Sequence, residues 1–297
     1  MKKIILLTII AFILGLDLIA QVDTESDKEI DSIVEELIFS DSESLLKYIE
    51  QLNNYQVIYT SIGFNDKAHF LGRDLGLNQN YFSAQIFYEH SIGVFFGISG
   101  AYYSEFDPKW DLTILTGGYG KYFGKHDNYN YELSYNRYIF TDNQSNDFEN
   151  SLDASFGAET NNNSFGISAN LVYFFGKKQG FQNSFDINGD IDLFKLSNKA
   201  KVTFTPLLTF QFGSENIDTS RIDDLISDFP VLDRIINSFE KYDLRNIQLQ
   251  LPVNLKFDNL QIEAGYNFNF PKALEFEQNL DNTSFFNLRV SYLIDLK

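Results

Sequence analysis

Three aspartates on one face of segment 181–194 are the clearest candidates for chemistry in this sequence. Asp186, Asp190 and Asp192 alternate with apolar residues such as Ile187 and Ile191, so in an extended chain they point to one side. Asp186 and Asp190 would lie roughly 13 Å apart, which is too far for both to bind one metal ion. They could form a wall that attracts cations, because like charges in a narrow space focus the potential. The favoured alternative is that they form ion pairs with cations on neighbouring segments.

The candidate cations, and one further acid, lie on the polar faces of three later segments. Lys201 belongs to the polar face of segment 201–212, Glu263 to that of 260–270 and Arg289 to that of 285–296. Lys256 is a further possible partner. We therefore expect six charged side chains on one interior wall: Asp186, Asp190, Asp192, Lys201, Glu263 and Arg289.

The remaining polar residues do not predict an enzyme. His69 lies in a long connection, while His90 and His126 lie in short connections at the other end, so we expect solvated turn histidines. A serine nucleophile needs a base on the same strand face, and no serine–histidine pair meets that condition. The motif from Asp186 to Asp190 lacks the other ligands of a calcium loop. We expect no catalytic residues, no cofactor and no metal site.

These side chains must be positioned by strands, because the sequence alternates with period 2 from Tyr55 onward. The segments expected to form strands are 55–64, 80–89, 91–103, 110–123, 128–140, 150–159, 163–175, 181–194, 200–213, 244–257, 260–270 and 284–296. Twelve is an even number, as a single-chain barrel with both ends on one side requires. The sequence therefore predicts an all-β transmembrane antiparallel up-and-down barrel of about 12 strands.

Strand length and loop length separate this prediction from a soluble sandwich. Most segments hold 10–14 residues, enough to cross a bilayer at a tilt, whereas soluble strands are usually about half as long. Aromatic residues near the segment ends suit interfacial girdles: Tyr129, Tyr131, Phe181, Phe212, Phe257 and Phe286. Long and short connections mostly alternate along the chain, as the long external loops and short periplasmic turns of outer-membrane barrels do. The connection near 176–180 is the exception.

The composition agrees with a barrel and excludes other classes. The chain has 297 residues, of which 44% are hydrophobic, with 30 Phe, 17 Tyr and no Cys. No stretch after residue 20 approaches the roughly 18 apolar residues of a membrane helix. The net charge of −18 argues against nucleic acid, whose phosphates attract lysine and arginine.

Two regions outside the strands carry helical patterns. Residues 1–20 have a basic start and an apolar run, so we expect a signal peptide cleaved after Ala20. Residues 21–54 are acidic, with apolar residues at helical spacing, and are expected to form a short helical extension, either a periplasmic arm or a plug. Residues 55–297 would form the barrel.

The long external loop 214–243 has the second helical pattern. Its apolar residues fall at helical spacing on both sides of Pro230, and we expect them to form a lid at the barrel mouth: Ile222, Leu225, Ile226, Phe229, Leu232, Ile235, Ile236 and Phe239.

Three stretches resemble those of uncharacterised outer-membrane β-barrel proteins of Gram-negative bacteria, of the porin-like superfamily. They are FLGRDLG at 70–76, YYSEFDPKWDLTILTGGYGKYF at 102–123 and SYNRYIF at 134–140. The resemblance covers most of residues 55–296 and implies a place in the outer membrane, in contact with its lipid. It brings no assigned activity or site residues.

The leading functional hypothesis is a passive or gated channel for small solutes. The alternative is a non-transporting surface or assembly protein whose loops or N-terminal arm bind a periplasmic or surface partner. An enzyme embedded in the barrel is the third and least favoured hypothesis. Twelve strands lie between barrels filled by side chains and barrels with wide water channels, so the strand count does not decide between pore and plug.

Overall fold

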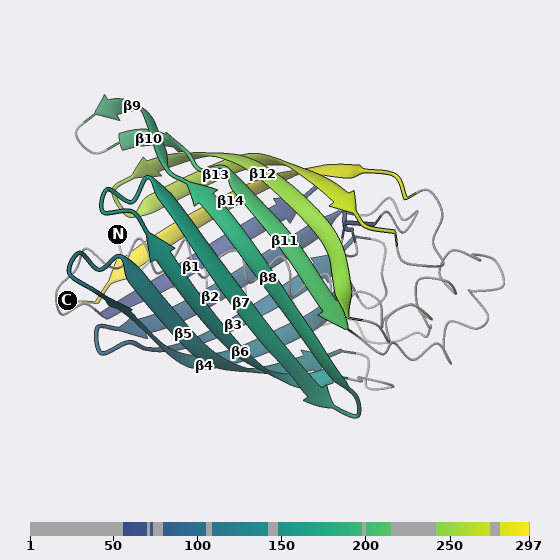
Figure 1. Cartoon of the computed structure of the whole chain (residues 1–297). Coiled ribbons are helices and arrows are strands. Elements are labelled where there is room, and N and C mark those ends of the chain that lie inside the picture. The colour runs from purple at the N-terminus through teal and green to yellow at the C-terminus, as the bar shows by residue number, and fades with distance from the viewer. Residues whose placement is uncertain are drawn as a thin grey trace.

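The computed structural model describes residues 56–69, 72–73, 80–104, 109–141, 148–197, 200–214, 242–273 and 280–296, and these form a β-barrel (Figure 1). The signal peptide, the extension 21–54 and the expected lid residues lie outside the described residues. No helix within the described part is long and apolar enough to cross a membrane.

Fourteen strands make up the described part of the chain. They are β1 (Gln56–Asn65), β2 (Tyr81–His90), β3 (Val94–Tyr103), β4 (Trp110–Phe123), β5 (Tyr129–Phe140), β6 (Phe148–Glu159), β7 (Phe165–Gly176), β8 (Gln179–Gly189), β9 (Ile191–Ser197), β10 (Ala200–Phe204), β11 (Leu207–Ser214), β12 (Asp243–Phe257), β13 (Leu260–Pro271) and β14 (Thr283–Asp295).

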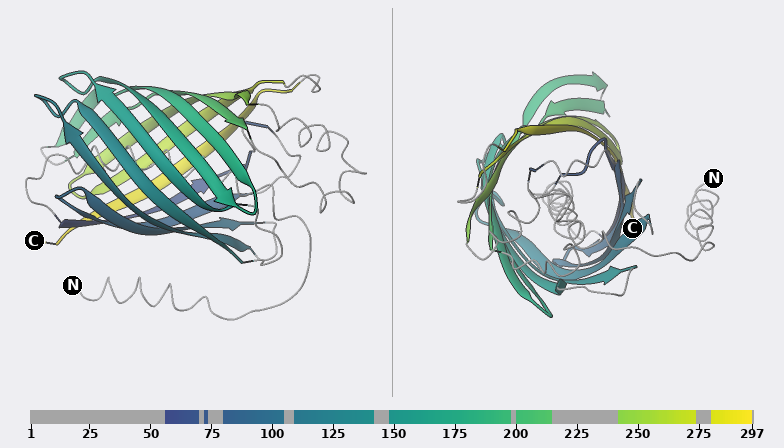
Figure 2. Two further views of the ribbon diagram at one scale, coloured as in Figure 1. Left: turned by 60° about the horizontal axis from the view of Figure 1, so that its bottom comes forward. Right: turned by 90° about the vertical axis from the view of Figure 1, so that its right-hand side faces the viewer.

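Twelve of these strands form a closed antiparallel wall, which confirms the predicted barrel. Sequence neighbours pair from β1 to β8 and from β12 to β14, β1 pairs with β14, and β11 joins β8 to β12. Viewed from one end, the strands form a complete ring (Figure 2). Closure leaves the ring without an open edge, so every wall strand has hydrogen-bonding neighbours on both sides.

The two remaining strands, β9 and β10, correct one detail of the prediction. Segment 181–194 was expected to form a single strand but divides at Asp190. Segment 200–213 was also expected to form a single strand but divides near Pro206. Proline has no N–H for the ladder, and the carbonyl of Pro206 instead accepts a bond from Gly189 at 2.9 Å. Beyond this break β9 and β10 form a hairpin that projects past the wall (Figure 1).

The alternation along each strand separates an apolar outer face from a mainly polar inner face. On β8, Phe181, Phe185 and Ile187 are exposed on the outside, while Ser184 and Asp186 are covered. The same division holds around the wall, where exposed apolar residues include Ile62, Phe96, Leu133, Leu152, Phe156, Ile167, Leu288, Val290 and Tyr292. In water such a belt would be unfavourable, whereas in lipid it is the expected surface.

Aromatic residues gather near both ends of the belt, as interfacial girdles require. At one end Phe123 stacks on Tyr129 with ring centroids 5.5 Å apart, and both lie near Phe156. Toward the other end Phe212 stacks on Tyr242 at 6.3 Å. A closed barrel with this belt satisfies its backbone inside the hydrocarbon layer, so the protein spans an outer membrane.

The two ends of the barrel differ in the lengths of their connections. Residues 91–93, 124–128, 160–164 and 258–259 form short turns at the end where β1 starts and β14 finishes. Gly93, Asp127, Asn163 and Asp258 have positive φ in these turns. The opposite end carries the long connections, of which 215–242 is the longest, together with one short turn at 177–178, the exception expected from the sequence. By the outer-membrane rule, the short turns face the periplasm.

Candidate functional site

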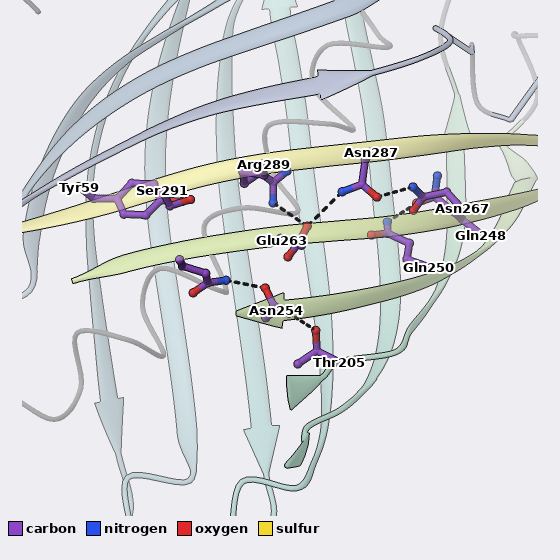
Figure 3. Close-up of polar contacts among 11 residues, drawn as sticks. Tyr59, Thr205, Gln248, Gln250, Asn254, Glu263, Asn267, Asn287, Arg289 and Ser291 are labelled. Atoms are coloured by element: carbon purple, nitrogen blue, oxygen red, sulfur yellow. Dashed lines mark hydrogen bonds and ion pairs between the residues drawn. The ribbon is translucent and has the colours of Figure 1, made fainter. Parts of the chain in front are cut away.

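The inner face of β12, β13 and β14 carries a ladder of amide side chains (Figure 3). Asn254 donates to Thr205 at 2.8 Å and accepts from Gln261 at 2.7 Å. Farther along, Asn267 donates to Asn287 at 2.9 Å. Each amide has both a donor and an acceptor, so a row of them can satisfy itself without any fixed charge.

One ion pair sits within this ladder, formed by two of the six charged candidates. Glu263 and Arg289 face each other on β13 and β14, with their nearest atoms 3.5 Å apart. Asn287 donates a further hydrogen bond to Glu263 at 3.1 Å. Side-chain exposures of 12% and 16% show that water reaches both groups only in part. The two charges largely cancel, which leaves this stretch of wall close to neutral.

Asp186 lies in a second polar cluster, on β8 opposite β7. Its carboxylate accepts a bond from Asn170 at 2.7 Å and another from Ser184 at 3.2 Å. Only 6% of the residue is exposed. Its partners are neutral hydrogen-bond donors instead of the lysine or arginine that the sequence suggested. Asp186 therefore contributes to the wall's internal bonding more than to an exposed charged surface.

The described residues that border the interior line a partly open cavity of about 130 Å³. Three of the six charged candidates line it: Asp190, Glu263 and Arg289. Nine amides also line it, namely Asn65, Asn130, Asn188, Gln248, Gln250, Asn254, Gln261, Asn267 and Asn287. These amides were not singled out as a group from the sequence, although their positions on alternating inward faces could have identified them.

The last two charged candidates, Asp192 and Lys201, lie on the β9–β10 hairpin outside the cavity lining. Lys201 donates to Asp192 at 2.8 Å. This contact lowers the pKa of the Asp192 carboxyl below its ordinary value. The Asp192 side chain is 60% exposed and the Lys201 side chain 40% exposed. The predicted ion pair between these segments is therefore present, but at the tip of the barrel wall.

At the opposite end, the chain after β1 turns into the barrel mouth (Figure 2). Asp66 anchors the turn by accepting a bond from the Phe286 amide at 2.7 Å. Arg73 is 2% exposed and donates to the carbonyl of Lys272 at 2.9 Å. The carbonyl of Gly72 accepts a bond from Thr283 at 2.6 Å. This mouth segment, defined as the described residues 66–69 and 72–73, is hydrogen-bonded to β14 and to the start of the β13–β14 connection.

His69 belongs to the mouth segment, and the expectation that it is solvated is wrong. It is 7% exposed, and its ring centroid lies 5.6 Å from that of Phe285. The adjacent Ala68 joins an apolar cluster made largely by inward residues of β2–β7: Tyr81, Ala101, Tyr103, Leu112, Ile114, Tyr138, Phe140, Val172 and Phe174. Apolar burial at the mouth draws this part of the loop inward.

Among the described residues, no group of three or more histidine, aspartate or glutamate side chains could hold a metal ion. The geometry consists of hydrogen-bond donors and acceptors around a confined polar space.

Comparison with known proteins gives similarity at the level of structure alone. No protein-family model matches the chain, and no curated protein sequence matches it. A KdgM porin matches at 9% identity, with a TM-score of 0.46, over 80% of this chain and 98% of the porin. A NanC porin matches at 7% identity, with a TM-score of 0.44, over 81% of this chain and 100% of the porin. The COG4313 outer membrane channel from Pseudomonas putida F1 matches at 11% identity, with a TM-score of 0.43, over 82% of this chain and 97% of the channel.

Proposed function

We propose that this barrel is a passive channel for small polar solutes across the outer membrane. The observation that carries the proposal is the polar cavity inside the closed wall, lined by nine amides and by the Glu263–Arg289 pair. A solute that leaves water needs replacement hydrogen bonds, and such a wall supplies both donors and acceptors.

The mouth segment sets the expected size limit of this channel. Residues 66–69 and 72–73 lie at the external end of the barrel, and Arg73 donates a hydrogen bond to a backbone carbonyl of the β13–β14 connection. A segment fixed across a mouth narrows it. The channel should therefore admit small solutes and exclude large ones.

Planar bilayer recording tests the proposal directly. Purified protein added to one chamber should give stepwise conductance increases in potassium chloride. The variant Gln250→Trp should lower the step size, because Gln250 lines the cavity. The matched variant Leu251→Trp should not, because Leu251 pairs with outward-facing Tyr266 on the lipid side. Absence of steps in the unmodified protein would refute the proposal.

The β9–β10 hairpin favours a second candidate function, the binding of a periplasmic protein. Among the described strands, β9 pairs with β10 on one side and with none on the other. All seven of its residues are exposed, including Ile191, Phe194 and Leu196. Lipid would leave the open edge without hydrogen bonds, and water would contact the apolar side chains. An added strand from a partner would satisfy both requirements.

Site-specific photo-crosslinking in cells separates this candidate from the first. A photoreactive residue at position 194 should give a discrete protein adduct if the hairpin docks a partner. The same residue at position 156, exposed on the lipid-facing belt, serves as the control. An identical pattern at both positions would remove the support for partner binding.

A further inference from the structure

The cavity lining shows much less charge imbalance than the protein as a whole. Its ionisable residues are Glu159, Asp190, Lys256, Glu263 and Arg289, which give a formal net charge of −1. The whole chain carries −18. Most of the acidic excess therefore lies elsewhere, so the cavity provides little electrostatic attraction for either sign of ion.

Neutral amides supply most of the polar lining instead. Gln250 and Gln261 are only partly covered and border the cavity from β12 and β13. Gln250 donates to Gln248, and Gln261 donates to Asn254 at 2.7 Å. Each primary amide has two N–H donors and two oxygen lone pairs, so one such bond leaves further capacity on the same side chain.

The cavity also has an apolar side. Leu207, Pro252 and Phe285 contribute to its lining. A ligand that fits must therefore present hydroxyl groups to the amides and carbon–hydrogen faces to these side chains. Small sugars and sugar alcohols have this combination, since each hydroxyl both donates and accepts.

We infer that the cavity is a binding site for small neutral polyhydroxylated solutes, of the size of a monosaccharide or a sugar alcohol. The inference rests on the proposed channel function and specifies its substrate class. Charged analogues of the same size are disfavoured, because the cations and anions of the lining nearly cancel, so a charged solute would lose water without gaining a net opposite charge in the wall.

Liposome swelling with three nearly isosteric solutes tests the inference. Vesicles containing the full-length protein are diluted into glucose, glucuronate or glucosamine at matched osmolarity, with counterion controls in protein-free vesicles. Glucose should enter fastest. Gln250→Leu should slow glucose entry by about two- to tenfold, as expected for the loss of one or two neutral hydrogen bonds. Entry of the charged solutes should change less.

A matched variant checks that the effect belongs to the cavity. Gln85→Leu removes an amide from β2 that lies on the inner face, opposite Ser61, but outside the cavity lining. It should leave the order of the three rates unchanged. Equal slowing by both variants would show a general effect on the barrel and overturn the assignment of the site.

The outcomes distinguish failure of the inference from failure of the channel. If charged solutes enter as fast as glucose or faster, the inference is overturned while the channel stands. If no solute enters, the channel proposal fails, and calorimetric titration of the detergent-solubilised protein with glucose decides the inference. Saturable heat that Gln250→Leu weakens would then support the site, and absence of heat at millimolar glucose would overturn it.

Discussion

Arginine substitutions at two adjacent positions of β12 should lower the free energy of unfolding by very different amounts, because the two side chains lie on opposite faces of the barrel wall. Leu251 pairs with Tyr266, which is exposed on the outer face. Gln250 lines the interior cavity. The variants Leu251→Arg and Gln250→Arg therefore place the same cation at nearly the same depth, once toward lipid and once toward the lumen.

The depth of these positions fixes the expected magnitude. β12 has 15 residues, from Asp243 to Phe257, so Gln250 is its middle residue and Leu251 the next. At about 3.4 Å per residue and a tilt near 40°, Leu251 lies only about 3 Å from the strand centre along the membrane normal. An arginine facing lipid at the midplane costs about 2–4 kcal/mol, equivalent to a factor of about 30 to 1,000 in the folding equilibrium.

Reversible folding into lipid vesicles, followed by tryptophan fluorescence during denaturant titration, measures this cost. Leu251→Arg should reduce the free energy of unfolding by the full amount, and Gln250→Arg by less than about 1 kcal/mol. Equal costs for the two variants, or a larger cost for Gln250→Arg, would refute the assignment of inner and outer faces.

Three further predictions follow from the mouth segment and the interior ion pair. Gly72→Ala should lower the free energy of unfolding by about 1–2 kcal/mol, because Gly72 has a φ of +78° and an added Cβ would lie 2.4 Å from Asn246; unchanged denaturation would contradict it. Arg73→Ala should raise single-channel conductance by releasing the mouth segment, whereas unchanged conductance would show that this segment does not limit flow. Glu263→Gln should shift the reversal potential in a salt gradient toward anion preference, because Arg289 loses its counter-charge; no shift would contradict the role of the pair.

The sequence predicted the barrel well because its main signal has the period of a strand. A period of two places every inward residue of a strand on one face, and an error of one residue would have inverted all of them. For β13 and β14, the apolar residues Tyr266, Leu288 and Val290 are exposed on the outer face as the alternation required. Alternating loop lengths predicted short turns at one end of the barrel, and the structure has them at 91–93, 124–128, 160–164 and 258–259.

The interior could not be predicted to the same degree, because it depends on the register between neighbouring strands and on contacts between segments distant in the chain. Asp186 received neutral partners instead of a cation, and Glu263 paired with Arg289 in a register that the sequence does not specify. His69 was expected in water, because the apolar cluster that draws its loop inward is assembled from strands distant in the chain. The break at Pro206 had a visible cause, a missing N–H, but its consequence depends on neighbouring strands.

The most direct test of the account is chemical modification of single cysteines during bilayer recording. The chain has no native cysteine, so Gln250→Cys and Leu251→Cys each introduce one unique thiol. A water-soluble cationic methanethiosulfonate reagent should lower the conductance of the Gln250→Cys channel in an irreversible step and leave Leu251→Cys unchanged. Modification that reduces conductance at position 251 but not at 250 would contradict the account of a polar solute path through the barrel interior.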